Sequence, residues 1–239
     1  MRSSLWICLL SSLLLGPAGT AHAGVLGTTV GASDYSGFRD TGNGLTGNQG
    51  WSTSEGGFKL SWNISQDAST MIWTYSYELR NADGSALAPE SSHSILQLSE
   101  SFALSDFTTL PRDPTDPTKS NIEVDTFVTT GTGGSNPGLP NDIYGVKLDE
   151  GNWDDVTFQT MRNPVWGNFY AKDGGGSTAA DGVYVFNNGL ASLGSANTQD
   201  FIPTPDTTTG ALPEPASLAV WGFGMAAWGG LARRRRRRV

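Results

Sequence analysis

The sequence predicts an all-β body, a β-sandwich with jelly-roll-like strand order, flanked by an N-terminal signal peptide and a single C-terminal transmembrane helix. Three observations predict this class. Apolar and polar residues alternate in short runs, Gly- and Pro-rich turns separate the runs, and the two chain ends are apolar or basic. The expected divisions are a signal peptide (1–23), the β-sandwich body (24–200), a Pro/Thr linker (201–212) and a tail (213–239).

The clearest strands are two neighbouring runs, 58–64 and 70–80, in which apolar side chains occupy every second position. The polar residues 65–69 between them are typical of a turn, so the two runs predict a β-hairpin. No internal repeat is present, which argues against a propeller or a solenoid. Shorter runs with strand character are 94–98, 122–128, 144–148, 156–158, 166–171 and 183–186.

Charge divides the chain into an acidic body and basic ends. The body keeps 8 of the 15 Lys and Arg residues and 22 of the 23 Asp and Glu residues, because Arg2, Arg233–Arg238 and Glu214 lie at the ends; its net charge is 8 − 22 = −14. Contacts with phosphate need Lys and Arg, so this charge argues against nucleic acid as a partner. The only cysteine, Cys8, lies in the leader, so the body has no thiol for a disulfide, a metal site or a nucleophile.

The first 23 residues have the parts of a secretory signal peptide. Arg2 is followed by an apolar run that ends at Gly16 and Pro17, and Ala21-His22-Ala23 supplies small residues before a cleavage site. Signal peptidase is therefore an expected partner, and Gly24 becomes the first residue of the exported chain.

The last 27 residues combine three features in a fixed order. The motif Pro213-Glu214-Pro215 comes first, an uncharged apolar stretch follows over 216–232, and six arginines come next. The stretch is near the shortest length that spans a bilayer as a helix. A basic cluster on one side of such a helix stays in the cytoplasm, which leaves the body outside. The arginines are Arg233, Arg234, Arg235, Arg236, Arg237 and Arg238.

This tail resembles the PEP-CTERM sorting signal, and the resemblance covers only about the last 28 residues. It implies recognition by an exosortase, a membrane protease-transpeptidase that cleaves near the Pro-Glu-Pro motif. It also implies an inner-membrane-anchored intermediate, followed by delivery to the cell surface or to an exopolysaccharide or biofilm matrix. A plain C-terminal membrane anchor is the alternative interpretation of the same residues.

The body offers few catalytic candidates. His93 is its only histidine, so a Ser-His-Asp triad would have to use it with Ser91 or Ser94, yet no Gly-x-Ser-x-Gly motif accompanies these residues. A structural or hydrogen-bonding role for His93 is favoured. A single histidine also excludes a multi-histidine zinc site.

Carboxylates and aromatic residues are the remaining candidates. Asp113 and Asp116 fall in one loop and Asp154 and Asp155 in another, and such loops supply oxygen ligands for calcium. Neither loop has EF-hand spacing, and solvated turn residues are the alternative. Paired carboxylates also serve glycosidases, but sequence spacing does not give their separation.

Aromatic residues near loops suggest a different kind of site. Trp153 and Trp166 are candidates for stacking on sugar rings, which a polysaccharide-binding module would require, and core packing is the alternative.

The expected function is that of a non-enzymatic, exosortase-sorted protein of the cell surface or extracellular matrix, with a structural or adhesive role and no cofactor apart from a candidate calcium site. Two alternatives belong to other classes: a surface carbohydrate-binding module, with extracellular polysaccharide as its partner, and a secreted hydrolase.

Overall fold

The computed structural model describes residues 25–88, 90–114, 116, 118, 121–129, 136–149, 153–173 and 182–205. The described residues form thirteen β-strands and five short helices. In chain order they are η1 (Ala32–Asp34), β1 (Ser36–Thr41), β2 (Gly44–Gly47), η2 (Gln49–Trp51), β3 (Lys59–Gln66), β4 (Trp73–Arg80), β5 (His93–Gln97), η3 (Leu104–Asp106), β6 (Phe107–Arg112), β7 (Ile122–Phe127), β8 (Ile143–Asp149), β9 (Asp155–Thr160), β10 (Pro164–Gly167), β11 (Phe169–Lys172), β12 (Tyr184–Asn187), α1 (Asn188–Ala191), η4 (Thr198–Asp200) and β13 (Ile202–Pro205).

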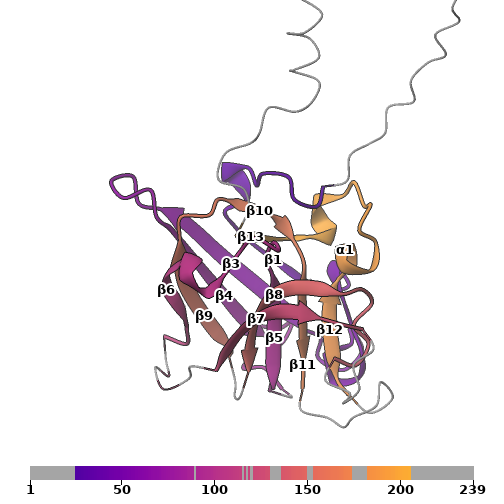
Figure 1. Ribbon diagram of the computed structural model, residues 1–239. Helices are drawn as coiled ribbons and strands as arrows, with labels where there is room; N and C mark the ends of the chain where they lie inside the picture. The colour runs from indigo at the N-terminus through magenta and orange to yellow at the C-terminus, as the bar shows by residue number, and fades with distance from the viewer. Residues whose placement is uncertain are drawn as a thin grey trace, which may run out of the picture.

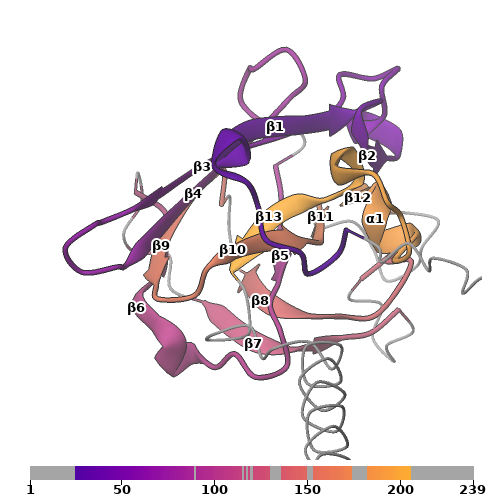
Figure 2. The same cartoon turned by 90° about the horizontal axis from the view of Figure 1, so that it is seen from above.

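Eleven strands join in one sheet in the order β6-β9-β4-β3-β1-β2-β12-β11-β5-β8-β7. All pairs are antiparallel except the short parallel contact between β1 and β2. The sheet curls until it is nearly a barrel, as the two views show (Figures 1 and 2). Its two edges are β6 and β7, which follow each other in the sequence.

The barrel interior is filled by side chains and by a second, two-stranded sheet. Strands β10 and β13 pair antiparallel, every residue in them is buried, and they cross the inside of the ring in Figure 2. The hydroxyl of Tyr77 on β4 donates to the Pro203 carbonyl of β13 at 2.8 Å, which ties this inner sheet to the wall. The interior is therefore a packed core.

The outer face of one half of the sheet carries a second, smaller core. Ile95, Tyr170 and Phe186 alternate with inward-facing neighbours on β5, β11 and β12, because successive side chains of a strand point to opposite faces. Leu139 and Leu190 cover them from outside. We call this group, with Phe127 and Ile143, the outer core.

The all-β class is confirmed, and the arrangement of the strands differs from the expected sandwich. Strand β1 pairs with β3 on one side and with β2 on the other, so the two halves of the molecule join into one curled sheet. Gly44 makes the turn into β2 at φ 90°, where an added Cβ would lie 2.3 Å from the Gln199 carbonyl oxygen. This crowding requires glycine at a turn that joins the two halves.

The body also extends beyond its expected boundary. Residues 201–205 belong to the linker predicted from the sequence, yet Phe201 and Ile202 are fully buried and β13 continues to Pro205. Prolines are tolerated here because β10 and β13 form a two-stranded sheet, in which half of the N–H groups of each strand face away from the partner.

Within the part of the chain that the structure describes, no helix has the length and apolar character needed to cross a membrane. The predicted membrane segment, 216–232, and the predicted signal peptide, 1–23, lie outside that part.

Candidate functional site

The predicted sorting residues lie outside the described residues. This applies to Pro213, Glu214 and Pro215 and to the arginine cluster 233–238. Their roles stay predictions from the sequence.

The two tryptophans proposed for sugar stacking are core residues, which corrects that prediction. Trp153 is 0% exposed and donates from Nε1 to the Asp149 carbonyl at 3.0 Å. Trp166 is 4% exposed and lies on β10 inside the barrel. Neither ring presents a face on which a sugar could stack.

The acidic calcium candidates are engaged in local contacts. Asp113 is buried and accepts from the backbone N–H of Asp116, whose own carboxylate accepts from Thr118. Asp155 forms an ion pair with Arg80 at 2.7 Å. Among the described residues, no three His, Cys, Asp or Glu side chains gather as a group that could hold a metal ion. Calcium binding, through these aspartates or Asp154, stays a prediction.

A cluster of buried or paired ionisable groups lies on the outer face of four neighbouring strands, β11, β5, β8 and β7. The register places His93 between Lys172 and Asp149, and the next outward-facing row places Lys147 beside Glu123. The ammonium of Lys147 contacts Glu123 at 2.8 Å and Asp149 at 3.0 Å. We call these five residues the outer polar cluster: Glu123, His93, Lys147, Asp149 and Lys172. It lies next to the outer core on the same face of the sheet.

Burial controls the protonation of this cluster. Desolvation lowers the pKa of His93 to about 4, helped by the positive charge of Lys172 and opposed by Asp149. Desolvation and the Lys147 charge also lower the pKa of Lys172, while the carboxylates of Asp149 and Asp173 raise it. The pKa of Lys147 is raised, because its hydrogen bonds and charge interactions with Glu123 and Asp149 outweigh its desolvation. At neutral pH the imidazole is neutral and Lys147 is charged.

The geometry around His93 is that of a structural histidine. Its Nε2 lies 3.1 Å from Oδ1 of Asn136, an oxygen that accepts a hydrogen bond from the Nε2–H of the neutral ring. The single hydroxyl hydrogen of Ser91 is directed at the carbonyls of His93 and Lys172, which lie 3.0 Å and 3.3 Å from its oxygen. Ser91 and His93 are therefore not arranged as nucleophile and base.

Sequence reasoning singled out His93 and missed the lysines beside it. The available signal was the placement of Glu123, Lys147 and Lys172 within otherwise apolar strand runs, where charged side chains mark the outward face. The pairing of β5 with both β8 and β11 is non-local and gives no local signal.

A buried arginine lies inside the barrel. Arg39 is 6% exposed and packs over the rings of Trp62 and Trp166, with 4.9 Å and 5.7 Å from its Cζ to the ring centroids. It donates to the carbonyls of Phe38 and Thr198. Desolvation lowers its pKa, and the charges of Asp34 and Asp200 oppose this shift. These contacts fix β1 to the inner sheet and to η4.

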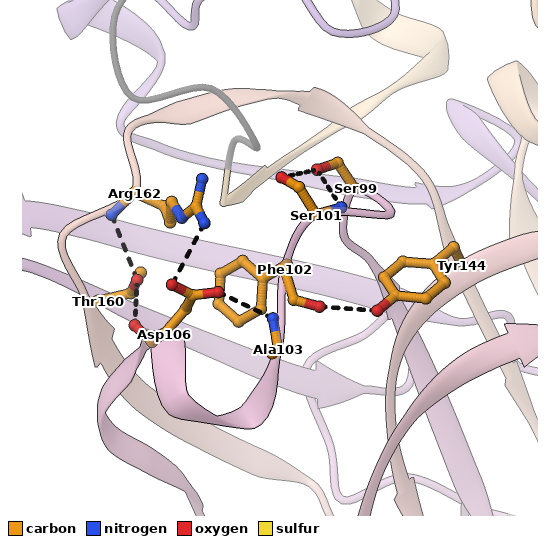
Figure 3. A network of polar contacts seen from close by, with 8 residues as sticks. All are labelled: Ser99, Ser101, Phe102, Ala103, Asp106, Tyr144, Thr160 and Arg162. Atoms are coloured by element: carbon orange, nitrogen blue, oxygen red, sulfur yellow. Dashed lines mark hydrogen bonds and ion pairs between the residues drawn. The ribbon is translucent and has the colours of Figure 1, made fainter.

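A polar network holds the connection between β5 and β6 across the gap between the sheet edges (Figure 3). The Tyr144 hydroxyl of β8 donates to the Phe102 carbonyl at 2.7 Å. On the other side, Asp106 pairs with Arg162 at 3.2 Å and accepts from the Ala103 N–H, while its carbonyl accepts from Thr160. Through the β5–β6 connection, the network links β8 to β9 across the gap between the sheet edges.

An open hollow of about 440 Å³ lies beside the outer core and is lined by Thr129, Pro140, Asn141, Asp142 and Leu193. The Asn141 amide donates to the Leu190 carbonyl, and the Asp142 carboxylate accepts from the Thr129 N–H. The polar groups of Asn141 and Asp142 connect the segments that line the hollow, and its lining residues include no nucleophile–base pair.

Comparison with known proteins adds no assignment. No family model, no curated protein and no solved structure matches this chain.

Proposed function

We propose that this chain is an exported protein of the cell surface or of an exopolysaccharide or biofilm matrix, sorted by an exosortase, in which the β body has a structural or adhesive role. The signal peptide directs export, the apolar tail helix holds the chain in the inner membrane with the arginines in the cytoplasm, and processing near Pro213–Pro215 follows.

One structural observation supports the proposal. The last strand that the structure describes, β13, ends at Pro205, and Pro213 comes eight residues later in the sequence. A protease could cut at the motif without removing any of the strands that the structure describes. The packed interior fits a passive role, because the groups that fill the barrel are engaged in packing and hydrogen bonds.

The two alternatives have less support in the described residues. A carbohydrate-binding module requires exposed aromatic rings, and Trp153 and Trp166 are buried. A hydrolase requires converging groups of suitable pKa, and His93 is buried with its Nε2 against Asn136.

The first experiment is intact-mass analysis and cell fractionation of the protein from its native cells. A product that starts at Gly24, ends near Pro213–Pro215 and copurifies with surface polysaccharide supports the proposal. A membrane product that retains Arg233–Arg238 would identify the tail as a plain anchor.

The variant Glu214→Ala tests the motif directly. We expect it to lose surface delivery while the body keeps the thermal unfolding transition of the unmodified protein, because Glu214 lies beyond the last described strand. Normal surface delivery of this variant would refute sorting through the motif. Thr208→Ala, a change in the predicted linker, is the matched control and should be sorted normally.

A further inference from the structure

The last described residue lies at a defined end of the barrel. Pro205 of β13 pairs with Pro164, which begins β10 directly after the turn 161–163. Figure 1 shows β10 and β13 at one end of the curled sheet. Ten residues, 206–215, separate Pro205 from the apolar stretch 216–232. A ten-residue chain reaches at most about 35 Å when fully extended. If that stretch spans a membrane, this end of the barrel is held within about 35 Å of it, which allows contact with the lipid surface.

Three exposed apolar side chains project at the same end. Thr160 of β9 pairs with Trp73 of β4 and with Phe107 of β6, so the three strands have neighbouring residues there. Met161 directly follows Thr160, Met71 comes two residues before Trp73, and Leu104 comes three residues before Phe107. Their exposed fractions are 61% for Met161, 54% for Met71 and 45% for Leu104. We call these three residues the apolar rim.

The backbone under the rim is held by hydrogen bonds. The Asp67 carboxylate accepts from the N–H and hydroxyl of Ser69 and from the N–H of Thr70, which fixes the tip of the β3–β4 hairpin. Met71 follows at φ 59°, in the left-handed region that residues with side chains rarely adopt.

The segment that carries Leu104 is held by the polar network around Asp106 and Arg162 (Figure 3). A surface whose backbone is already fixed loses little conformational freedom when it binds.

Charges around the rim favour a neutral partner. Asp34 and Asp67 place two negative charges at this end, and Arg162, a cation at the same end, is paired with Asp106. The body as a whole is acidic. Anionic lipids attract basic segments and would repel this end, whereas a zwitterionic lipid surface would accept exposed Met and Leu side chains.

We propose that the apolar rim contacts the external lipid surface of the membrane that the tail crosses, so that the body stands on this end before processing. This inference rests on the proposed tail anchor. It assigns the opposite end, with the outer polar cluster, to the side that faces away from the membrane.

The test uses the full chain with residues 213–239 retained, reconstituted into phosphatidylcholine vesicles and isolated by flotation. Cys8 is replaced by serine, and a single cysteine carries an environment-sensitive fluorophore at Met161→Cys or, as a second site, Met71→Cys. The control is Glu55→Cys, an exposed residue that precedes β3 at the opposite end of the sheet.

We expect the probes at 161 and 71 to emit at shorter wavelength and to be quenched by brominated phosphatidylcholine, with no such change at 55. Adding phosphatidylglycerol should reduce the quenching. Protein that floats with the vesicles but shows no quenching at 161 and 71, or equal quenching at 55, overturns the rim contact and leaves the anchor intact. Protein that does not float overturns both.

Discussion

Acidification should destabilise the folded body through His93. Its pKa is about 4 in the folded protein, chiefly because the ring is buried, and about 6.5 in an unfolded chain. Between these values the unfolded state binds more protons than the folded state, so the free energy of unfolding falls as the pH falls through this window. Near neutral pH the effect is small, since the ring is then largely neutral in both states.

The magnitude follows from the two pKa values. Each pH unit well inside the window changes the free energy of unfolding by about 1.4 kcal/mol per titrating group. Lowering the pH from 7 to 5 should therefore remove about 2 kcal/mol through His93 alone. The groups that face the ring are Lys172, Lys147, Asp149 and Asn136.

Urea unfolding followed by tryptophan fluorescence at pH 7, 6 and 5 measures this loss, because Trp51 and Trp153 are fully buried. The control is His93→Gln, whose amide can donate to Asn136 and does not titrate. Carboxylates contribute equally to both proteins, so the difference between their pH profiles isolates the imidazole. Parallel profiles would refute the reasoning and would mean that His93 is accessible to protons in the folded state.

Two further predictions concern packing inside the barrel. Trp73→Ala should lower the free energy of unfolding by about 3–5 kcal/mol, because Trp73 is 6% exposed and its Nε1 donates to Asn163. The control Leu110→Ala, at a position 50% exposed, should stay within about 0.5 kcal/mol of the unmodified protein in the same denaturation assay. Equal effects of the two substitutions would contradict the assigned core. Tyr77→Phe should cost about 1–3 kcal/mol, since it leaves the buried Pro203 carbonyl without its donor; an unchanged midpoint would mean that this bond does not hold the inner sheet.

Strands with clear alternation were predicted correctly from the sequence. The runs 58–64 and 70–80 correspond to β3 (Lys59–Gln66) and β4 (Trp73–Arg80), which pair as the predicted hairpin. In these strands, apolar side chains at every second position face the barrel core, so the local pattern and the tertiary packing agree.

Strands whose position depends on distant partners were missed. β6 contains Pro111 and pairs irregularly with β9, so its sequence does not have the pattern of a strand. The run 166–171 was expected as one strand, yet it divides at Asn168 between β10 inside the barrel and β11 in the wall. β13 is buried because it lies inside the barrel, and this environment exists only once the other strands have folded around it.

The outer polar cluster was only partly predictable for the same reason. His93 was noticeable as the single histidine of the body, but its partner Asn136 is 43 residues away. Lys147 and Lys172 come from strands on either side of β5. Their electrostatic effect on the histidine exists only once three separate segments have paired.

The place of β13 inside the barrel also constrains the order of folding. The bond between Tyr77 and Pro203 spans 126 residues, so it closes one of the longest loops in the body. The N-terminus of a nascent chain emerges first, so the strands of the curved sheet are available before β13, the strand that fills it. Long-range pairing of this kind forms slowly. Until residue 205 has emerged, the apolar lining has no inner sheet to cover it. Completion of the body is thus coupled to arrival of the chain's C-terminal part, and a nascent body needs protection from aggregation throughout that interval.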